Sequence, residues 1–329
     1  MTKTIDQVIE KDFALYNGDC VEVVKGLPDN SVHYSIFSPP FSSLYTYSNS
    51  DRDMGNSRDD EEFFEHFRFL IRELYRVIMP GRLVSIHCMN LPTSKTHHGY
   101  IGIRDFRGEI IRAFQDEGWI YHSEVCIWKD PVVAQQRTKA LGLLHKQVVK
   151  DSAMSRQGIP DYLVTMRKPG VNEEPISGEF EEFIGEGTDV SREAYEKQAA
   201  EHRAKGKEPW PFEMWRSVLV WQKYASPVWM DINPSNTLQY RSAREEKDEK
   251  HICPLQLDVI ARGVELWSNP GDIVLSPFAG IGSEGYQSIK MGRRFVGAEL
   301  KGSYYRTAVR NLYNAVAERD QGEQLVAEL

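Results

Sequence analysis

The sequence has no paired cysteines, no long hydrophobic run and no overall positive charge. Its four cysteines are isolated and form no CxxC pair, which argues against a zinc site or a disulfide scaffold and indicates buried thiols in a reducing compartment. No apolar run approaches the ~20 residues that a membrane-spanning helix needs, and the polar start Met1-Thr2-Lys3 is unlike a signal peptide. We therefore expect a cytoplasmic protein with no membrane segment and no metal.

The formal net charge of −8 averages over unlike regions of the 329 residues. Between Lys129 and Lys168 there are eight Lys or Arg residues against three acids, whereas acids dominate from Glu173 to Glu213. A basic face can therefore exist on an acidic protein, although a solvated helix face explains the same charges. The length suits one large α/β domain with an insertion, or two domains.

Apolar runs alternate with amphipathic segments at both ends of the chain. Strands are predicted at about residues 13–17, 32–37, 83–87, 120–128, 162–166, 272–275 and 295–298. Helices are predicted at about residues 21–27, 61–79, 107–116, 136–149 and 191–204, with a further helix ending near residue 291. This alternation is typical of a mostly parallel sheet covered on both faces.

The strand predicted at residues 32–37 ends at Ser38-Pro39-Pro40-Phe41, which we call the clamp. Two prolines fix φ twice and remove two backbone donors, so the chain turns abruptly and nearby carbonyls stay available as acceptors. We expect the aromatic ring to stand out from the strand end. A hydroxyl, a carbonyl and an aromatic face together predict a site for a flat group that bears an amine. The polar span Ser42 to Asp60 predicts a functional loop.

A second motif, Ser276-Pro277-Phe278-Ala279-Gly280-Ile281-Gly282, links a strand to a helix, and we call it the glycine loop. Glycines at such a turn let a ligand approach the backbone amides at the helix N-terminus. Glu299 ends the next strand, where it suits ribose hydroxyls. Residues 280–285 also match GxGxxG, so a nicotinamide oxidoreductase is an alternative, but Pro277 to Ala279 separate the first glycine from its strand, unlike that fingerprint.

The order of the two motifs predicts a permuted sheet. After Glu299 only thirty residues remain, enough for one or two helices but not for the further strands of a six-stranded sheet. The other strands must come from upstream, which brings the clamp beside the glycine loop at the carboxyl ends of the strands. A nucleotide-like cofactor and the amine site would then share one crevice.

These motifs resemble those of the DNA amino-methyltransferases, which transfer a methyl group from S-adenosylmethionine to adenine N6 or cytosine N4. The clamp resembles their [D/N/S]-P-P-[Y/F] motif, the glycine loop resembles D-P-F-x-G-x-G, and the order resembles the permuted β group of stand-alone and phage-type enzymes. The resemblance implies a doubly wound, mostly parallel Rossmann-like sheet. It also implies a catalytic half at 1–130, an inserted target-recognition region at 131–236 and a cofactor-binding half at 237–329.

The resemblance also implies roles for single residues. The target base is flipped out of the duplex, Phe41 stacks on it, and the Ser38 hydroxyl and the Pro39 carbonyl accept its N–H bonds at the corner that Pro40 completes. The implied cofactor contacts are the adenosine region for Asp19, the ribose for Glu299 and the methionine end for Gly280 and Gly282. The segment with His251 and Pro254 is implied to help hold the methionine end, and Ser276, Pro277 and Phe278 are the other implied residues of the cofactor motif.

The implied partner is double-stranded DNA, with Lys139, Lys146 and Arg156 as candidates for phosphate contacts, and β-group members commonly form homodimers. Two departures from the family pattern matter. Ser276 replaces a common acid, so another residue must contact the methionine amino group. Ser38 replaces the Asp frequent in adenine enzymes, and serine tends toward cytosine N4. We favour adenine N6, with cytosine N4 as the alternative.

Two further classes remain open. Methyltransferases acting on RNA or on protein amides usually carry the cofactor motif first, which the order here disfavours. A non-catalytic DNA-binding module would carry the same basic segment without using the clamp.

Overall fold

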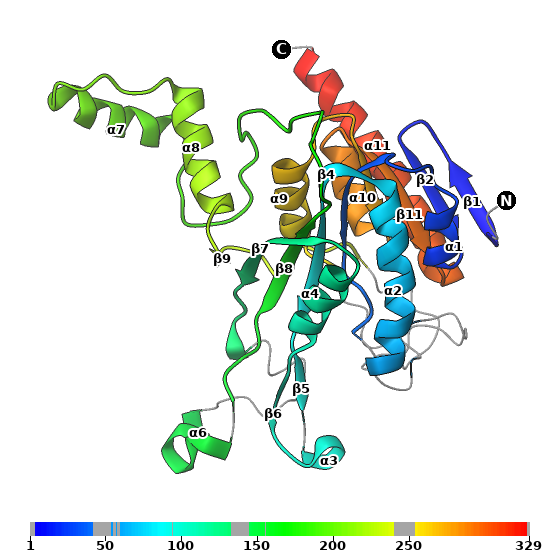
Figure 1. Ribbon diagram of the computed structural model, residues 1–329. Coiled ribbons are helices and arrows are strands. Elements are labelled where there is room, and N and C mark those ends of the chain that lie inside the picture. The colour runs from blue at the N-terminus through cyan, green and yellow to red at the C-terminus, as the bar shows by residue number, and fades with distance from the viewer. Residues whose placement is uncertain are drawn as a thin grey trace.

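The computed structural model describes residues 4–41, 54, 57, 60–93, 95–132, 145–154, 156–239 and 254–327 (Figure 1). Lys139, His251 and almost all of the loop predicted at Ser42 to Asp60 lie outside these ranges. Within them, no helix is both long and apolar enough to cross a membrane.

One mixed sheet forms the centre of the described structure. Its nine strands, in spatial order, are β1 (Asp6–Ile9), β2 (Phe13–Asn17), β11 (Arg294–Glu299), β10 (Ile273–Ser276), β3 (Val32–Phe37), β4 (Ile78–Met89), β8 (Asp161–Arg167), β7 (Ile120–Ile127) and β9 (Val228–Trp229). The five strands from β2 to β4 are parallel, and β8 runs antiparallel between β4 and β7. We call the end where these five strands finish the carboxyl edge, and the opposite end the amino edge.

The two ends of the chain meet in the middle of this sheet. β10 pairs in parallel with β3, so that Val274 lies opposite Tyr34 and Leu275 lies opposite Ser35. The Ser35 hydroxyl donates a buried hydrogen bond of 2.9 Å to the Leu275 carbonyl, which fixes this register. The predicted permuted, mostly parallel sheet is confirmed, because the strand before the clamp neighbours the strand before the glycine loop.

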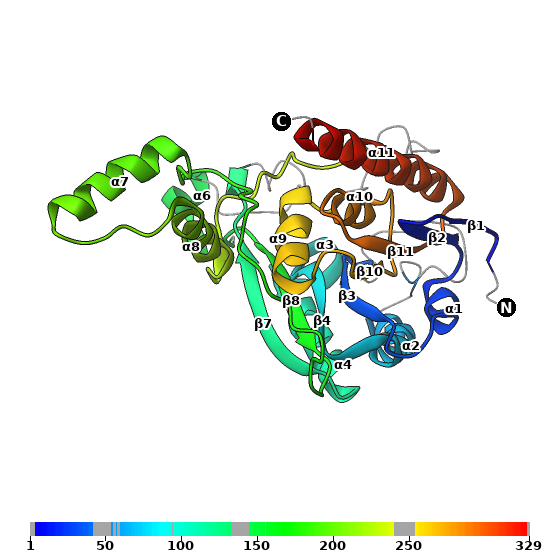
Figure 2. The ribbon, with the colours of Figure 1, turned by 90° about the horizontal axis from the view of Figure 1, so that it is seen from above.

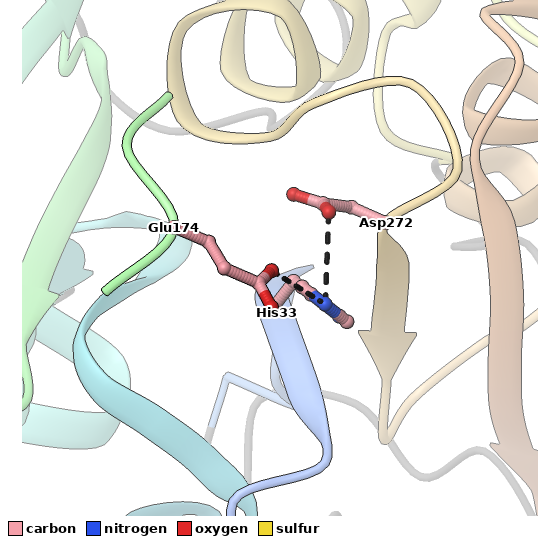
Figure 3. Close-up of side chains that lie close together, drawn as sticks. All are labelled: His33, Glu174 and Asp272. Atoms are coloured by element: carbon pink, nitrogen blue, oxygen red, sulfur yellow. Dashed lines mark ion pairs between the residues drawn. The ribbon is translucent and has the colours of Figure 1, made fainter. Parts of the chain in front are cut away.

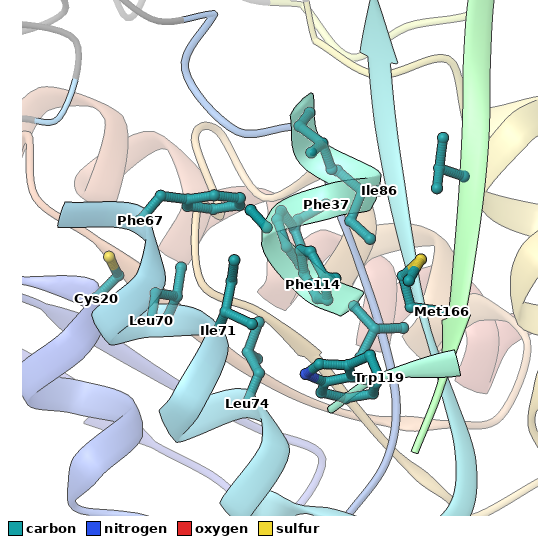
Figure 4. Close-up of a cluster of buried hydrophobic side chains, with 14 of the residues drawn as sticks. Cys20, Phe37, Phe67, Leu70, Ile71, Leu74, Ile86, Phe114, Trp119 and Met166 are labelled. Atoms are coloured by element: carbon teal, nitrogen blue, oxygen red, sulfur yellow. The ribbon is translucent and has the colours of Figure 1, made fainter. Parts of the chain in front are cut away.

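Helices cover both faces of the sheet (Figure 2). One face carries α1 (Cys20–Lys25), α2 (Asp60–Val77) and α4 (Phe106–Asp116), and the other carries α9 (Leu257–Trp267), α10 (Ser283–Lys290) and α11 (Gly302–Ala327). Phe67, Leu70, Ile71 and Leu74 form the apolar stripe of α2 and are fully buried against the sheet and α4 (Figure 4). The alternation of elements along the chain thus produces a doubly wound fold.

The boundary between α2 and β4 differs from the prediction. The helix ends at Val77, and β4 begins at Ile78 instead of Leu83. Ile78 pairs with Val32, and the pairing shifts register before Tyr34 and Leu83 meet. Gly81 takes a φ of +75°, which the strand accommodates within this irregular stretch. Pro80-Gly81 therefore interrupts the regular pairing and does not stop the helix.

The central span contributes both to the sheet and to projecting parts. β8 belongs to the sheet, whereas α7 (Arg192–Ala204) and α8 (Phe212–Tyr224) lie apart from it, beyond β9 (Figures 1 and 2). β5 (Leu91–Thr93), α3 (Lys95–His98), β6 (Gly102–Arg104) and α6 (His145–Lys150), with a 3-10 turn at Ser152–Met154, extend past the carboxyl edge. The division at residues 130 and 236 stays a proposal, since two strands of the sheet, β8 and β9, lie between them.

Candidate active site

The clamp and the glycine loop leave adjacent strands at the carboxyl edge. Ser38 follows the last residue of β3, and Pro277 follows the last residue of β10. The rings of Phe37 and Phe278, one from each segment, lie 5.7 Å apart. Two motifs separated by more than two hundred residues in the sequence therefore form one site.

Within the clamp, Pro39 is buried, while Ser38 and Phe41 are half-buried. The Phe41 ring meets Phe106 of α4 edge-on, with ring centres 6.2 Å apart. The expectation that this ring stands clear of the strand end is therefore wrong in part, because its contact with α4 removes apolar surface from water. Phe106 supports the ring from the core side.

Gly280 and Gly282 of the glycine loop have different surroundings. Gly280 has a φ of +54°, and among the described residues other than its chain neighbours no heavy atom lies within 4 Å of the position that a Cβ would take. Gly282 has a φ of +87°, and a Cβ there would lie 3.2 Å from Ala308 of α11. Gly280 thus leaves open space above the loop, while Gly282 permits the close packing of α11. Phe278, also in the glycine loop, packs its ring near the rings of Phe37 and Phe67.

Glu299 holds the glycine loop in place. Its Oε2 accepts the Gly280 N–H at 2.8 Å, and its Oε1 accepts the Lys301 N–H at 2.8 Å. Asn17, which sequence reasoning did not single out, is buried and donates from Nδ2 to the carbonyls of Glu299 and Leu300. Glu299 and Asn17 thus fix the glycine loop relative to the ends of β11 and β2.

The other predicted cofactor residues lie around this loop. Asp19 is half-buried and caps α1, because its Oδ1 accepts from the N–H groups of Val21 and Glu22 at 3.0 and 3.1 Å. Ser276 is completely buried, and its hydroxyl has no hydrogen-bond partner among the described residues. A buried hydroxyl without a partner is costly, which fits a position that a polar ligand completes. Pro277 is buried, and Pro254 is half-buried before α9.

Glu284, on the first turn of α10, is an acid that the sequence prediction passed over. It is buried, and burial raises the pKa of its carboxyl to about 8, with a further contribution from the Glu299 carboxylate. Glu284 lies on the helix that directly follows the glycine loop and is close enough to Glu299 for the two carboxyl groups to interact electrostatically. The sequence feature that could have indicated Glu284 was its position inside the GxGxxG match of residues 280–285.

A line of polar side chains runs inward from Ser38. His87 Nδ1 lies 3.3 Å from the Ser38 Oγ, and His87 Nε2 lies 3.2 Å from Asp161 Oδ2. The second contact is an ion-pair distance without the alignment of a linear hydrogen bond. Lys129 Nζ contacts Asp161 Oδ1 at 2.5 Å. Burial alone would raise the pKa of Asp161, but Lys129 and His87 outweigh it and lower this pKa to about 2.

Four of the six described cations of the basic segment have structural partners: Lys129, Arg156, Arg167 and Lys168. Lys168 donates to the Asn30 side chain and the Ile78 carbonyl, and Arg167 donates to the carbonyls of Gly81 and Gly170. Arg156 is half-buried and donates to the Gln157 carbonyl, and burial lowers the pKa of its guanidinium. Of the three predicted phosphate contacts, only Lys146 lies fully exposed within the described chain.

A second histidine cluster lies at the amino edge (Figure 3). His33 Nε2 lies 3.5 Å from Glu174 Oε2 and 3.6 Å from Asp272 Oδ1, and Arg82 contacts Asp272 at 3.2 Å. The spacing resembles a metal site, but His33 Nδ1 accepts the Ile273 N–H at 3.1 Å. Neutral His33 therefore carries its proton on Nε2, facing the carboxylates, and cannot offer that nitrogen to a metal. The cluster is an ion network.

The chain has relatives among known proteins. Type II methyltransferase M.BglII of Bacillus subtilis is 23% identical over 292 residues, which cover 88% of this chain and 66% of that protein. DNA adenine methyltransferase YhdJ of Escherichia coli (strain K12) is 36% identical over 94 residues, which cover 28% of this chain and 31% of that protein. The chain thus matches less than two thirds of either relative.

Solved structures share the fold. TTHA0409 of Thermus thermophilus, determined in complex with S-adenosyl-L-methionine, matches with a TM-score of 0.58 at 21% identity, covering 92% of this chain and 95% of that one. The family model described as DNA methylase, which groups N6 and N4 methylases, matches residues 32–310. Because this match takes in the clamp, the glycine loop and both halves of the permuted sheet, the chain belongs to the N6/N4 family of DNA methylases.

Proposed function

We propose that this protein is a site-specific DNA methyltransferase that uses S-adenosylmethionine to methylate the exocyclic amine of a flipped base. The observation that carries the proposal is the parallel pairing of β3 with β10, which sets Ser38-Pro39-Pro40-Phe41 beside the glycine loop in a chain of this family. The nicotinamide oxidoreductase alternative finds no support, because the relatives are methyltransferases.

The residues of the carboxyl edge fit S-adenosylmethionine. Gly280 leaves open space above the loop, Glu299 offers carboxylate oxygens, and the buried Ser276 hydroxyl lacks a partner within the described structure. Asp19 is the proposed contact for the adenosine region, with Oδ2 as the atom not used in capping α1. The bound cofactor supplies an electrophilic methyl group. His251 is proposed for the methionine end but lies outside the described residues.

The clamp residues are proposed to bind and orient the base. Phe41, supported from behind by Phe106, stacks on the ring, and Ser38 and the Pro39 carbonyl accept the two amine N–H bonds. Those acceptors push electron density onto the amine nitrogen, and positioning supplies the rest of the rate. A hydroxyl and a carbonyl satisfy either amine. We favour adenine N6, which agrees with the name of YhdJ, and keep cytosine N4 as the alternative.

The DNA would approach the carboxyl edge, where α6 carries exposed Lys146 and Lys150. We propose that target recognition uses the parts of residues 131–236 outside β8, including the projecting pair α7 and α8. A homodimer and a cytoplasmic location remain predictions from the family and from the DNA substrate.

The test is methyl transfer to DNA. The protein is incubated with tritiated S-adenosylmethionine and unmethylated, sequence-diverse duplex DNA, and the labelled nucleosides are then identified as N6-methyladenine or N4-methylcytosine. We expect Ser38→Ala to lower kcat by roughly 10²- to 10³-fold with little change in cofactor affinity. Ser31→Ala, a half-buried serine just before the other end of β3 whose hydroxyl donates to the Pro28 carbonyl, should match wild type. Absence of label on all DNA overturns the proposal.

A further inference from the structure

We propose that His87 is a positioning residue that works through Ser38: it orients the Ser38 hydroxyl and takes its proton while the target amine loses one, with Asp161 and Lys129 behind it. This inference rests on the proposed function, since it concerns how the clamp handles the amine. It adds three residues to the reaction that neither motif contains.

Four strands bring these residues to one point of the carboxyl edge. Phe37 at the end of β3 pairs with Ile86 of β4, so Ser38 and His87 lie at the same level. Asp161 is the first residue of the antiparallel β8 and pairs with Met89 on one side and Ile127 on the other. Lys129 follows the end of β7 by two residues. From Ser38 of the clamp, a line of polar side chains thus runs across the sheet through His87 and Asp161 to Lys129.

The contacts assign the hydrogens. Asp161 is 2% exposed, and its Oδ1 lies 2.5 Å from the Lys129 Nζ, so the charged lysine keeps this carboxyl ionised. This carboxylate lies 3.2 Å from the His87 Nε2 and electrostatically favours the tautomer of neutral His87 that carries its proton on Nε2. His87 Nδ1 is then an acceptor, and the group within reach is the Ser38 hydroxyl at 3.3 Å. With its own hydrogen directed at His87, the Ser38 oxygen presents lone pairs to the amine, as the proposed clamp requires.

The same arrangement balances the proton. The amine nitrogen uses its lone pair to bond the methyl carbon, and the pair of the broken carbon–sulfur bond stays with sulfur. One N–H proton moves to Ser38 Oγ as the original hydroxyl proton moves to His87 Nδ1. The resulting imidazolium faces the Asp161 carboxylate, which stabilises it. A serine alone is too weak a base to keep that proton, so a partner behind it is needed.

A packing role alone explains the group poorly. Asp161 is buried to 2% exposure at the rim of the sheet, and a buried charge of this kind is costly unless it is fully paired. Apolar side chains would fill the same space at lower cost. His87 Nδ1 also lies beside the Ser38 hydroxyl, which we propose binds the target amine. In contrast, Nδ1 of His33 at the amino edge ends at the backbone N–H of Ile273.

The experiment compares His87→Asn with His87→Ala in single-turnover methyl transfer to unmethylated duplex DNA, alongside calorimetric binding of S-adenosylmethionine. Asparagine keeps an acceptor near the Nδ1 position but cannot take a proton. We expect the single-turnover rate constant of both variants to fall by roughly 10²-fold or more, with cofactor Kd within about twofold of wild type. Added imidazole should restore part of the rate of His87→Ala and none of the rate of Ser38→Ala.

His33→Asn is the matched control, because it removes a histidine that also lies beside a buried acid but at the other edge of the sheet; its rate per folded molecule should equal wild type. His87→Asn turning over within threefold of wild type overturns the relay, because an acceptor alone would then suffice. If His87→Asn fails to fold, Asp161→Asn decides: wild-type turnover in that variant also overturns the relay. Failure of the wild-type protein to label DNA would instead reject the proposed function.

Discussion

The two edges of the sheet carry similar sets of residues with opposite consequences. At the amino edge, His33 lies between Asp272 and Glu174, with the buried Arg82 beside them. At the carboxyl edge, His87 lies between Ser38 and Asp161, with Lys129 beside Asp161. Each edge combines a histidine, an acid and a cation.

The difference lies in what the second histidine nitrogen meets. His33 Nδ1 accepts the Ile273 N–H of β10, so this nitrogen joins β3 to β10 and cannot take a proton from another group. His87 Nδ1 lies within hydrogen-bond distance of the half-buried Ser38 hydroxyl, in the clamp beside the glycine loop. The same residue types thus serve stability at one edge and, by our proposal, proton transfer at the other. Residue identity alone does not distinguish these uses.

The largest effect should come from breaking the amino edge. Asp272→Ala leaves Arg82, which has no exposed surface, without its closest acid, and breaking a buried ion pair costs about 3–5 kcal/mol. We expect the free energy of unfolding in urea to fall by that amount. Methyl transfer per folded molecule should stay at the wild-type rate, and a selective loss of turnover would show that the amino edge also serves the reaction.

A second, smaller effect should appear at the carboxyl edge in the pH dependence of stability. The pKa of Glu284 is raised to about 8 in the folded protein, whereas its ordinary value, expected in the unfolded chain, is 4.5. Between these two pH values unfolding releases the Glu284 proton, so the free energy of unfolding of the wild type falls as pH rises toward 8. Glu284→Gln removes this loss. Between pH 5 and pH 7, wild type should lose about 3 kcal/mol more than the variant.

The measurement is urea unfolding of both proteins across this pH range without cofactor. Parallel stability curves would show that Glu284 is ionised in the folded protein. A confirmed difference would mean that the carboxyl edge keeps a group that lowers stability at neutral pH, as expected of a binding site, whereas the amino edge is built for stability.

The smallest effect concerns DNA approach to the carboxyl edge. Lys146→Ala on α6 should weaken binding to duplex DNA of any sequence and reduce the slope of log K against log salt by about 1. Lys25→Ala, an exposed lysine at the far end of α1, is the control and should leave the slope unchanged. Equal slopes for the two variants would remove α6 from the proposed DNA surface.

The order of motifs along the chain was enough to predict the permuted sheet and the neighbourhood of the clamp and the glycine loop. Local physics explains this success. Prolines and glycines constrain the backbone where they stand, and the short chain after Glu299 leaves no room for the remaining strands. Boundaries were less predictable: Pro80-Gly81 lies within β4 and interrupts its pairing with β3, while backbone hydrogen bonds from Gly81 to Lys168 and from Lys168 to Arg82 continue the strand past this point.

Only the tertiary structure joined Ser38 to His87, Asp161 and Lys129. These residues are separated by dozens of positions and belong to no shared motif, and their contact depends on the antiparallel insertion of β8 between β4 and β7. The tertiary structure also separated this histidine from His33, whose sequence surroundings are no less polar. By itself, the sequence determined the family, the fold and the two motifs; cross-strand register determined which polar side chains face the reaction, because hydrogen-bond partners are set by distances in space.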